Sequence, residues 1–145
     1  MNQVQERQEE IISEFQTLGG DLELTLQYLM ELGERMAPMQ EADKTEENIV
    51  KGCQSKVWLK ASLDNSVVHF TGDSNTAITK GLVSLLIRVF DKQTPQEILN
   101  AELIFPSRIG MDRFIGTQRS NGFGAMLQQF KRYAIAYRAI QQNHQ

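Results

Sequence analysis

The hydrophobic pattern changes its period in the middle of the chain, and this change limits the possible folds more than any other feature. From residue 57 to residue 63 apolar and polar side chains alternate, which is typical of a β-strand with one buried face. Asp64-Asn65-Ser66 then favours a tight turn, because Asp and Asn tolerate left-handed backbone conformations, and residues 67–71 form a returning strand. Ile49-Val50 can add a short third strand, with residues 51–55 as the connection. The pattern predicts a small antiparallel sheet of about three strands.

Helical periodicity occupies the chain before this sheet. Residues 3–18 carry one apolar stripe, and Gly19-Gly20 ends it. Asp21 is expected to cap a second helix, because its carboxylate can accept hydrogen bonds from the free amides of the first turn. The inner face of that helix is expected to hold Leu22, Leu26, Leu29 and Met30. Trp58, on the opposite face of the first strand from its apolar neighbours, is expected to bury against these two helices.

Helical signals return after the second strand. Asp73 or Ser74 is expected to cap a helix over residues 78–89, and Thr94-Pro95-Gln96-Glu97 has the sequence of a capping box with proline at the first helical position. Ser120 is expected to cap a long last helix. Helices before and after a small hairpin favour the α+β class, with residues 1–145 as a single domain.

Composition excludes several classes of protein. The 145 residues are 41% hydrophobic and 23% charged, which is ordinary for one globular domain. A net charge of -3, without a dense basic run, argues against nucleic acid as a partner. The first ten residues are too polar for a signal peptide, and the apolar stretch 82–90 is too short to span a bilayer. We therefore expect a cytoplasmic protein that does not engage a membrane.

The chain has a single cysteine, Cys53. One thiol cannot form an internal disulfide or a thiolate cage for zinc or an iron–sulfur cluster. His69 and His144 do not supply the missing ligands. Gly52 permits a sharp loop, Gln54 and Ser55 add little bulk, and Lys51 would favour a thiolate if its ammonium lay close. The alternative is a buried structural cysteine, since free cysteine is often buried.

Residues 50–58, with the sequence V-K-G-C-Q-S-K-V-W, resemble the V-x-G-C-x-S-x-V-W motif of the SufE family of sulfur acceptors, of the SufE or the CsdE type. Residues 21–33, 72–82 and 119–126 resemble further family segments in the family's order. The sequence departs from the family at Leu22, where Trp is usual, at Phe123, where Leu is usual, and in the run before Arg119.

The resemblance implies a SufE/IscU-like fold and a sulfur carrier rather than a stand-alone enzyme. Cys53 would accept persulfide sulfur from a SufS- or CsdA-type cysteine desulfurase, stimulate it, and pass the sulfur to an iron–sulfur scaffold. A CsdE-type acceptor feeding a different sulfur pathway is the alternative, as is an interaction module that activates the desulfurase without carrying sulfur. Pyridoxal phosphate would belong to the partner, so no cofactor or metal is expected here. The sequence leaves open a monomer or a homodimer.

Several residues are expected to support Cys53. Arg119, expected just before the last helix, would approach Cys53 and stabilise a thiolate or persulfide anion, or else form an ordinary ion pair. Asn121 and Gly122 are expected to shape a turn. Asp73 would cap a helix and, by the resemblance, control how readily the cysteine loop opens. His69 either forms a Cys–His nucleophile pair, as a hydrolase or transferase would need, or is a partly exposed strand histidine. A scaffold for iron–sulfur clusters would need several thiolates.

Overall fold

The N-terminal part of the chain is a pair of helices. The computed structural model describes residues 2–143, and it begins with α1 (Gln3–Gln16) and α2 (Leu22–Arg35). Gly19 and Gly20, with φ of 64° and 76°, make the turn between them. Asp21 caps α2 as expected, because its carboxylate accepts the Leu24 amide hydrogen bond at 2.9 Å.

The predicted inner face of α2 is only partly right. Leu29 is fully buried, but Leu22 is 55% exposed. The buried positions of α2 are Thr25, Leu29 and Gly33, which follow one another at intervals of four residues and face α3 (Ala77–Phe90). Leu22 lies in the first turn, one turn before this contact begins.

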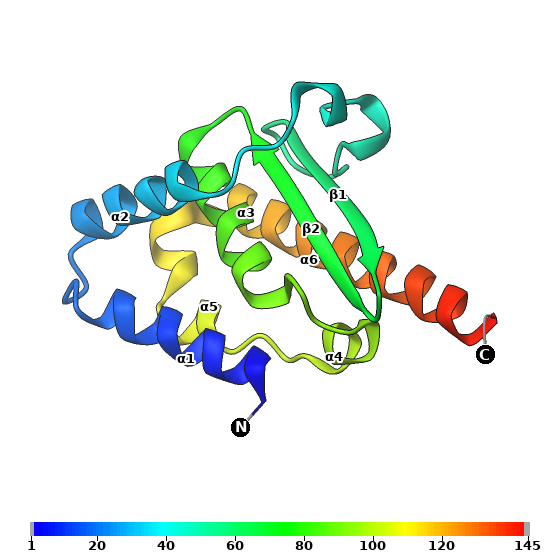
Figure 1. Cartoon of the computed structure of the whole chain (residues 1–145). Helices are drawn as coiled ribbons and strands as arrows, with labels where there is room; N and C mark the ends of the chain where they lie inside the picture. Colours follow the sequence, from blue (N-terminus) through cyan, green and yellow to red (C-terminus); the bar gives the residue numbers. More distant parts are fainter. Residues whose placement is uncertain (1, 144–145) are drawn as a thin grey trace.

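Helix α3 runs through the middle of the molecule (Figure 1). Its buried face includes Leu82, Leu85, Leu86 and Val89. The α2 backbone lies directly against it: a Cβ at Gly81 would come within 2.2 Å of the Leu29 carbonyl oxygen. Helix α1 is joined to α3 by the Arg88 guanidinium, which donates to Glu14 at 2.8 Å.

The sheet contains two antiparallel strands, β1 (Val57–Asp64) and β2 (Val67–Ser74). In the register Trp58 faces Asp73 and Asp64 faces Val67. The expected third strand is wrong, because Ile49 forms only an isolated bridge to Trp58. Ile49 follows directly on a turn of 3-10 helix, η2 (Glu46–Asn48), and Gly52, with φ of 96°, turns the chain away again.

Several outer backbone groups of both strands have partners outside the sheet. On β1 the carbonyls of Val57, Leu59 and Ala61 accept hydrogen bonds from the Val50 amide at 2.8 Å, the Tyr133 hydroxyl at 3.2 Å and the Tyr137 hydroxyl at 2.9 Å. On β2 Val68 exchanges hydrogen bonds with residues 92–93, and the Phe70 amide donates to the Asp91 carboxylate at 2.8 Å.

The C-terminal part adds α4 (Pro95–Asn100), α5 (Phe105–Arg108) and α6 (Met111–Asn143). The capping box before α4 is confirmed: Thr94 and Glu97 each accept the other's amide hydrogen bond. Gly116, with φ of 80° and ψ of 171°, interrupts α6. The helix is already running at Ser120, so the expected cap at that residue is wrong.

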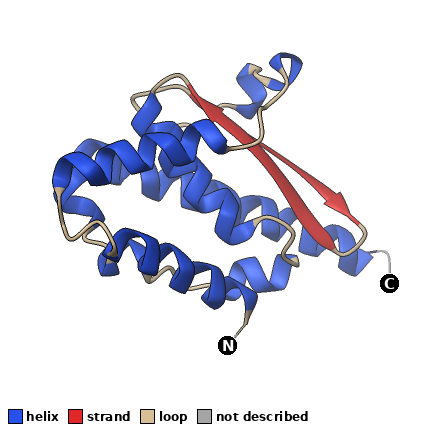
Figure 2. Cartoon of the chain, turned by 60° about the vertical axis from the view of Figure 1, so that its left-hand side comes forward, coloured by secondary structure: helices blue, strands red, loops and turns tan. Residues whose placement is uncertain are grey.

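The two faces of the hairpin have different covers. Helices α3 and α6 lie on one face (Figures 1 and 2), where Phe130 of α6 packs on Phe70 with ring centroids 4.6 Å apart. The other face carries the segment with η1 (Glu41–Asp43) and η2. Trp58 is half-buried beneath the Lys44 ammonium, 5.9 Å from its ring centroid. Its expected burial against α1 and α2 is therefore wrong.

The arrangement is the α+β class predicted from the sequence, with two strands in place of about three. Among the helices of residues 2–143, none combines the length and the apolar character that a membrane span requires.

Candidate functional site

Cys53 lies on a loop whose two ends are fixed to the sheet and to the start of α3. The Val50 amide donates to the Val57 carbonyl at 2.8 Å. The Lys56 amide donates to the Asn75 side-chain oxygen at 3.0 Å, and the Asn75 amide returns a bond to the Lys56 carbonyl at 3.2 Å. These bonds anchor the base of the loop, which leaves its tip as the part that can move.

The tip of the loop is held by a weaker contact. The half-buried Cys53 thiol donates to the Gly122 carbonyl, with Sγ and oxygen 3.5 Å apart. A Cβ at Gly122 would lie 3.5 Å from Sγ, which is ordinary contact distance. Gly122 lies inside α6, so its expected role in a turn is wrong, as it is for its exposed neighbour Asn121. Gly122 instead forms the surface on which the thiol rests.

Cys53 borders a cavity of about 430 Å³ between its loop, α3 and α6. The lining consists of residues 53–55 from the loop, Thr79 and Leu82 from α3, and residues 115–119, Gly122 and Met126 from α6. This volume is in the range of small-molecule sites. The cavity can therefore take in atoms attached to the cysteine sulfur.

Burial raises the pKa of the Cys53 thiol. The expectation that Lys51 favours a thiolate is not met in this conformation, because Lys51 is exposed and desolvation alone sets the direction of the pKa shift. At rest the thiol is protonated and donates its hydrogen to the Gly122 carbonyl. Burial in this position therefore lowers the fraction of the nucleophilic thiolate.

Arg119 lines the same cavity as Cys53. Its guanidinium donates to the Ile115 carbonyl one turn earlier in α6, at 3.4 Å. The residue lies within α6 rather than before it, because the helix resumes after Gly116. In the described part of the chain no carboxylate lies within ion-pair distance of Arg119, so a positive charge stands beside the cavity without an acidic partner.

A row of hydroxyl groups joins the loop to α3. The Ser55 and Thr76 hydroxyl oxygens are 2.9 Å apart, and the Thr79 hydroxyl donates to Ser55 at 3.4 Å. Sequence reasoning missed Thr79, which is only 5% exposed. A signal was present: Thr79 precedes Leu82 by three positions and Val83 by four, which places a hydroxyl on the buried face of α3. Gln54, the remaining loop residue, borders the cavity and is exposed.

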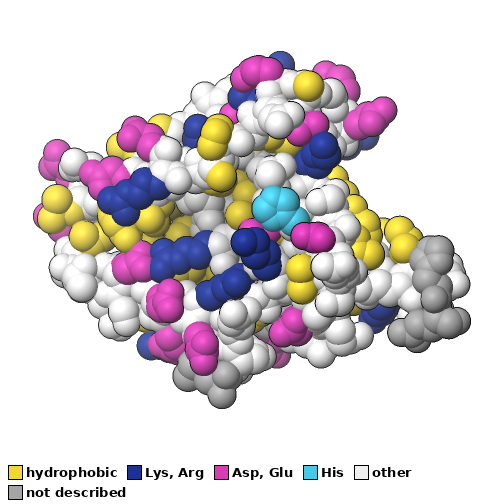
Figure 3. Space-filling view, in the orientation of Figure 1, with side chains coloured by type: hydrophobic (Ala, Val, Ile, Leu, Met, Phe, Trp, Pro, Cys, Tyr) yellow, Lys and Arg dark blue, Asp and Glu magenta, His cyan; other side chains and the backbone are white. Residues whose placement is uncertain are grey.

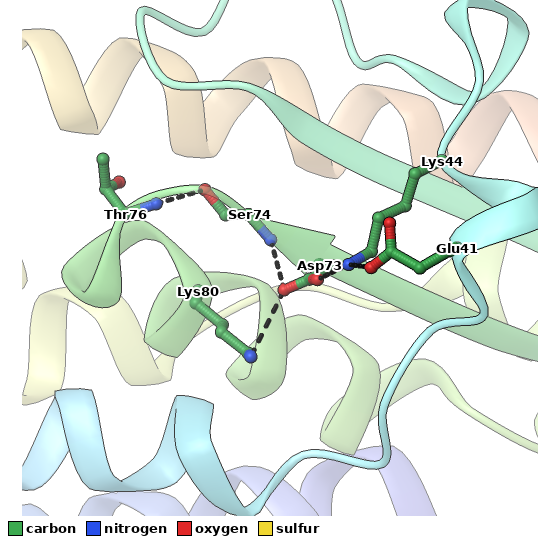
Figure 4. Close-up of polar contacts among 6 residues, drawn as sticks. All are labelled: Glu41, Lys44, Asp73, Ser74, Thr76 and Lys80. Carbon is green, nitrogen blue, oxygen red and sulfur yellow. Dashed lines mark hydrogen bonds and ion pairs between the residues drawn. The ribbon is translucent and has the colours of Figure 1, made fainter.

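Asp73 is the last residue but one of β2 and does not cap α3, whose N-cap is Thr76. Its carboxylate pairs with Lys44 at 2.7 Å and Lys80 at 3.4 Å, and accepts the Ser74 amide at 2.8 Å (Figure 4). Desolvation raises the pKa of Asp73, but the hydrogen bonds from Lys44 and Ser74 and the charge of Lys80 outweigh it, so the net pKa is lowered. Asp73 thus connects the segment that covers Trp58 to α3.

His69 lies toward the turn end of β2, away from the loop of Cys53. Its Nδ1 is 2.9 Å from the Asp91 carboxylate, and its side chain is 46% exposed. The description as a partly exposed strand histidine is confirmed, and His69 is not among the residues that line the Cys53 cavity. His144 lies outside the described residues.

Comparison with known proteins places the chain in a family. A family model described as "SufE: Fe-S metabolism associated domain" matches residues 9–134. The fold is similar to the solution structure of a hypothetical protein from Thermus thermophilus, with a TM-score of 0.73 and 20% sequence identity. That match covers 90% of this chain and 94% of that chain. The structural likeness shows a shared fold, whereas the family match spans most of the sequence, including Cys53. The chain therefore belongs to the SufE family, which is associated with Fe–S metabolism.

Proposed function

We propose that this protein accepts sulfur on Cys53 as a persulfide from a cysteine desulfurase and passes it to iron–sulfur cluster assembly. The observation that carries the proposal is the position of the thiol, on a loop tip beside a cavity of about 430 Å³. Family membership supplies the link to Fe–S metabolism. A sequence with a single cysteine also suits a carrier, because a second thiol would displace the sulfur and form a disulfide.

The transfer is a thiol exchange. The Cys53 thiolate attacks the outer sulfur of a persulfide on the donor cysteine. A bond forms between Cys53 Sγ and that sulfur, the donor's sulfur–sulfur bond breaks, and the donor cysteine leaves as a thiolate that takes up a proton. No external oxidant or reductant is required. Because Cys53 is half-buried at rest, its loop tip must first leave Gly122 to reach the donor.

After the transfer, the cavity can hold the sulfur that Cys53 has accepted. With the loop tip returned to α6, the added sulfur would lie between α3 and α6, screened from bulk solvent and stray nucleophiles. Arg119 borders this space with no acidic partner among residues 2–143, so its guanidinium is available to an anionic sulfur. The pyridoxal phosphate chemistry that removes sulfur from cysteine belongs, in this proposal, to the desulfurase.

The proposal is tested by mass measurement. The protein is incubated with a SufS-type desulfurase and cysteine, and the masses of the intact protein and of its peptides are measured by mass spectrometry. We expect an adduct of one sulfur on the peptide with Cys53, and none in Cys53→Ser. His69→Ala serves as the matched control and should load normally, because His69 is paired with Asp91 away from the cavity.

The same experiment separates the rival functions. Full stimulation of the desulfurase by Cys53→Ser, with no adduct on the native protein, would show an interaction module that carries no sulfur. Loss of loading in His69→Ala would instead point to a Cys–His pair. Faster loading by a CsdA-type desulfurase than by a SufS-type enzyme would favour the alternative, a CsdE-type acceptor that feeds a different sulfur pathway.

A further inference from the structure

Three residues with hydroxyl groups line the cavity next to Cys53, namely Ser55, Thr79 and Thr117, of which Thr117 is exposed. Ser55 and Thr79 are hydrogen-bonded to each other, and the sulfur transfer step itself does not use them. Ser55 lies two residues after the cysteine, and Thr79 faces the cavity from the first turn of α3. Thr79 is buried, with 5% of its surface exposed. A buried hydroxyl at an otherwise apolar helix position has a desolvation cost, so its hydrogen bonds need an explanation.

The hydrogen bond of Thr79 is long. Its hydroxyl donates to Ser55 at 3.4 Å, whereas hydroxyl hydrogen bonds usually span about 2.5–3.0 Å. The Ser55 hydroxyl has a closer neighbour, Thr76, at 2.9 Å. A hydroxyl hydrogen rotates freely about its carbon–oxygen bond. Thr79 can therefore turn its hydrogen toward a new acceptor in the cavity at little cost.

An anionic sulfur in this cavity needs such a donor. The group that now contacts the Cys53 sulfur is the Gly122 carbonyl oxygen, an acceptor that would repel a negative charge. The Arg119 guanidinium borders the cavity too, but Arg119 is exposed to solvent, so water and salt screen its charge more than that of a buried donor. Burial already raises the pKa of the Cys53 thiol, so an anion here is disfavoured unless hydrogen bonds compensate.

We infer that Thr79, assisted by Ser55, donates a hydrogen bond to the terminal sulfur of the Cys53 persulfide and holds that sulfur in the cavity as an anion. The inference rests on the proposed function. Thr79 is a positioning residue in this account: the bond to sulfur is made and broken at Cys53, while the hydroxyl sets the charge and place of the cargo. A methyl group in place of the hydroxyl, as in valine, keeps the volume and removes the donor.

The test measures the ionisation of the persulfide directly. Cys53 is loaded with inorganic polysulfide, which bypasses the desulfurase, and the near-ultraviolet absorbance of the persulfide anion is followed against pH. We expect Thr79→Val to weaken the acidity of the persulfide roughly tenfold, a rise of about one pH unit in the midpoint. Thr79→Ser should return the midpoint to that of the native protein. Ser84→Ala is the matched control, because its hydroxyl lies on α3 but donates to the Gly81 carbonyl.

An unchanged midpoint in Thr79→Val, or no recovery in Thr79→Ser, would overturn the inference, since packing alone would then explain the residue. If Thr79→Val does not fold, as a thermal melt would show, Ser55→Ala carries the test with the same expected direction. The two proposals fail in different ways. A protein that the desulfurase cannot load, but whose polysulfide-loaded form shows the shift, contradicts the function and supports the role of Thr79.

Discussion

The contact between α2 and α3 and the contact between the cysteine loop and α6 both involve glycine, but they differ in how closely the two sides approach. Where α2 crosses α3, backbone touches backbone: a Cβ at Gly81 would come within 2.2 Å of the Leu29 carbonyl oxygen, and one at Gly33 within 2.8 Å of the Gly81 nitrogen. Where the cysteine loop meets α6, a Cβ at Gly122 would lie 3.5 Å from Cys53 Sγ. The first contact holds two helices at a fixed separation. The second is an ordinary side-chain contact, which can open without disturbing the helices.

The hydrogen bonds and ion pairs of these two regions also differ. The Arg88 hydrogen bond lowers the pKa of Glu14 despite partial burial, and desolvation with the hydrogen bond to Glu14 raises the pKa of Tyr28 to about 12. This cluster ties α1, α2 and α3 together. Figure 3 shows basic side chains gathered on the face over α1 and α3, with hydrophobic side chains beside them. The ion pairs of Asp73 with Lys44 and Lys80 instead connect the loop segment with η1 to β2 and to α3.

Adding one methyl group at each contact compares the two regions directly, and Gly81→Ala is expected to have the largest effect. Gly81→Ala should destabilise the protein by about 3 kcal/mol, because α2 must move away from α3, and lower Tm by roughly 10 °C. Gly122→Ala should change the free energy of unfolding by less than about 1 kcal/mol. Urea unfolding measures both.

The matched control is Gly124→Ala, on the exposed side of α6 with nothing within 4 Å of the added Cβ. It should stabilise by about 0.5–1 kcal/mol, through helix propensity alone. Equal losses in Gly81→Ala and Gly122→Ala would show that the loop contact is as rigid as the helix contact.

A smaller effect is expected from Asp73→Asn, which removes the charge that holds Lys44 and Lys80. At pH 7 we expect a loss of about 1–2 kcal/mol and faster alkylation of Cys53, as the segment with η1 loosens. Since folding lowers the pKa of Asp73, its contribution is present above the unfolded value of about 3.9 and disappears as pH falls through the folded pKa. Native and variant proteins should therefore converge in urea unfolding at strongly acidic pH.

Asp73→Glu tests whether charge alone is sufficient, because it keeps the carboxylate and changes only its reach. If Asp73→Asn altered neither the alkylation rate of Cys53 nor sulfur loading, Asp73 would have no part in opening the loop.

The smallest expected effect is on the pH dependence of the thiol. Because burial raises the pKa of Cys53, its alkylation rate should continue to rise above about pH 8.5, where an ordinary thiol is half ionised. Alkylation of the urea-unfolded chain supplies the reference curve. A folded midpoint at or below that of the unfolded chain would mean that the thiol already stands free of Gly122.

The sequence predicted the local elements better than their contacts. Asp21 and the Thr94 capping box were correct because a cap needs only residues close in the chain. The expected cap at Asp73 is wrong because its carboxylate pairs with Lys44, which is distant in sequence. A local pattern does not reveal such a partner. The hairpin was recognised from alternation, while the third strand was not formed because neighbouring turns interrupt it.

The site shows a similar division. The loop of Cys53 followed from its motif, but the surface beneath it did not. Placing Arg119 and Gly122 inside α6 depends on the break at Gly116, an exposed glycine with φ of 80° and nothing within 4 Å of an added Cβ. The local sequence fits a helix that starts at Gly116 as well as one that starts at Ser120. Thr79 was visible as a hydroxyl on an apolar helix face, yet its position beside Cys53 depends on how α3 lies against the loop.

The occupied backbone groups along the outer sides of β1 and β2 limit how this protein can associate. A two-stranded sheet is an open template for further strands, and exposed sheet edges are sites of aggregation. Here the Tyr133 and Tyr137 hydroxyls occupy carbonyls on one edge, and residues 91–93 occupy the other. These contacts interrupt the ladder along both edges, so we expect a protein that binds this molecule to recognise it through side chains rather than by extending its sheet.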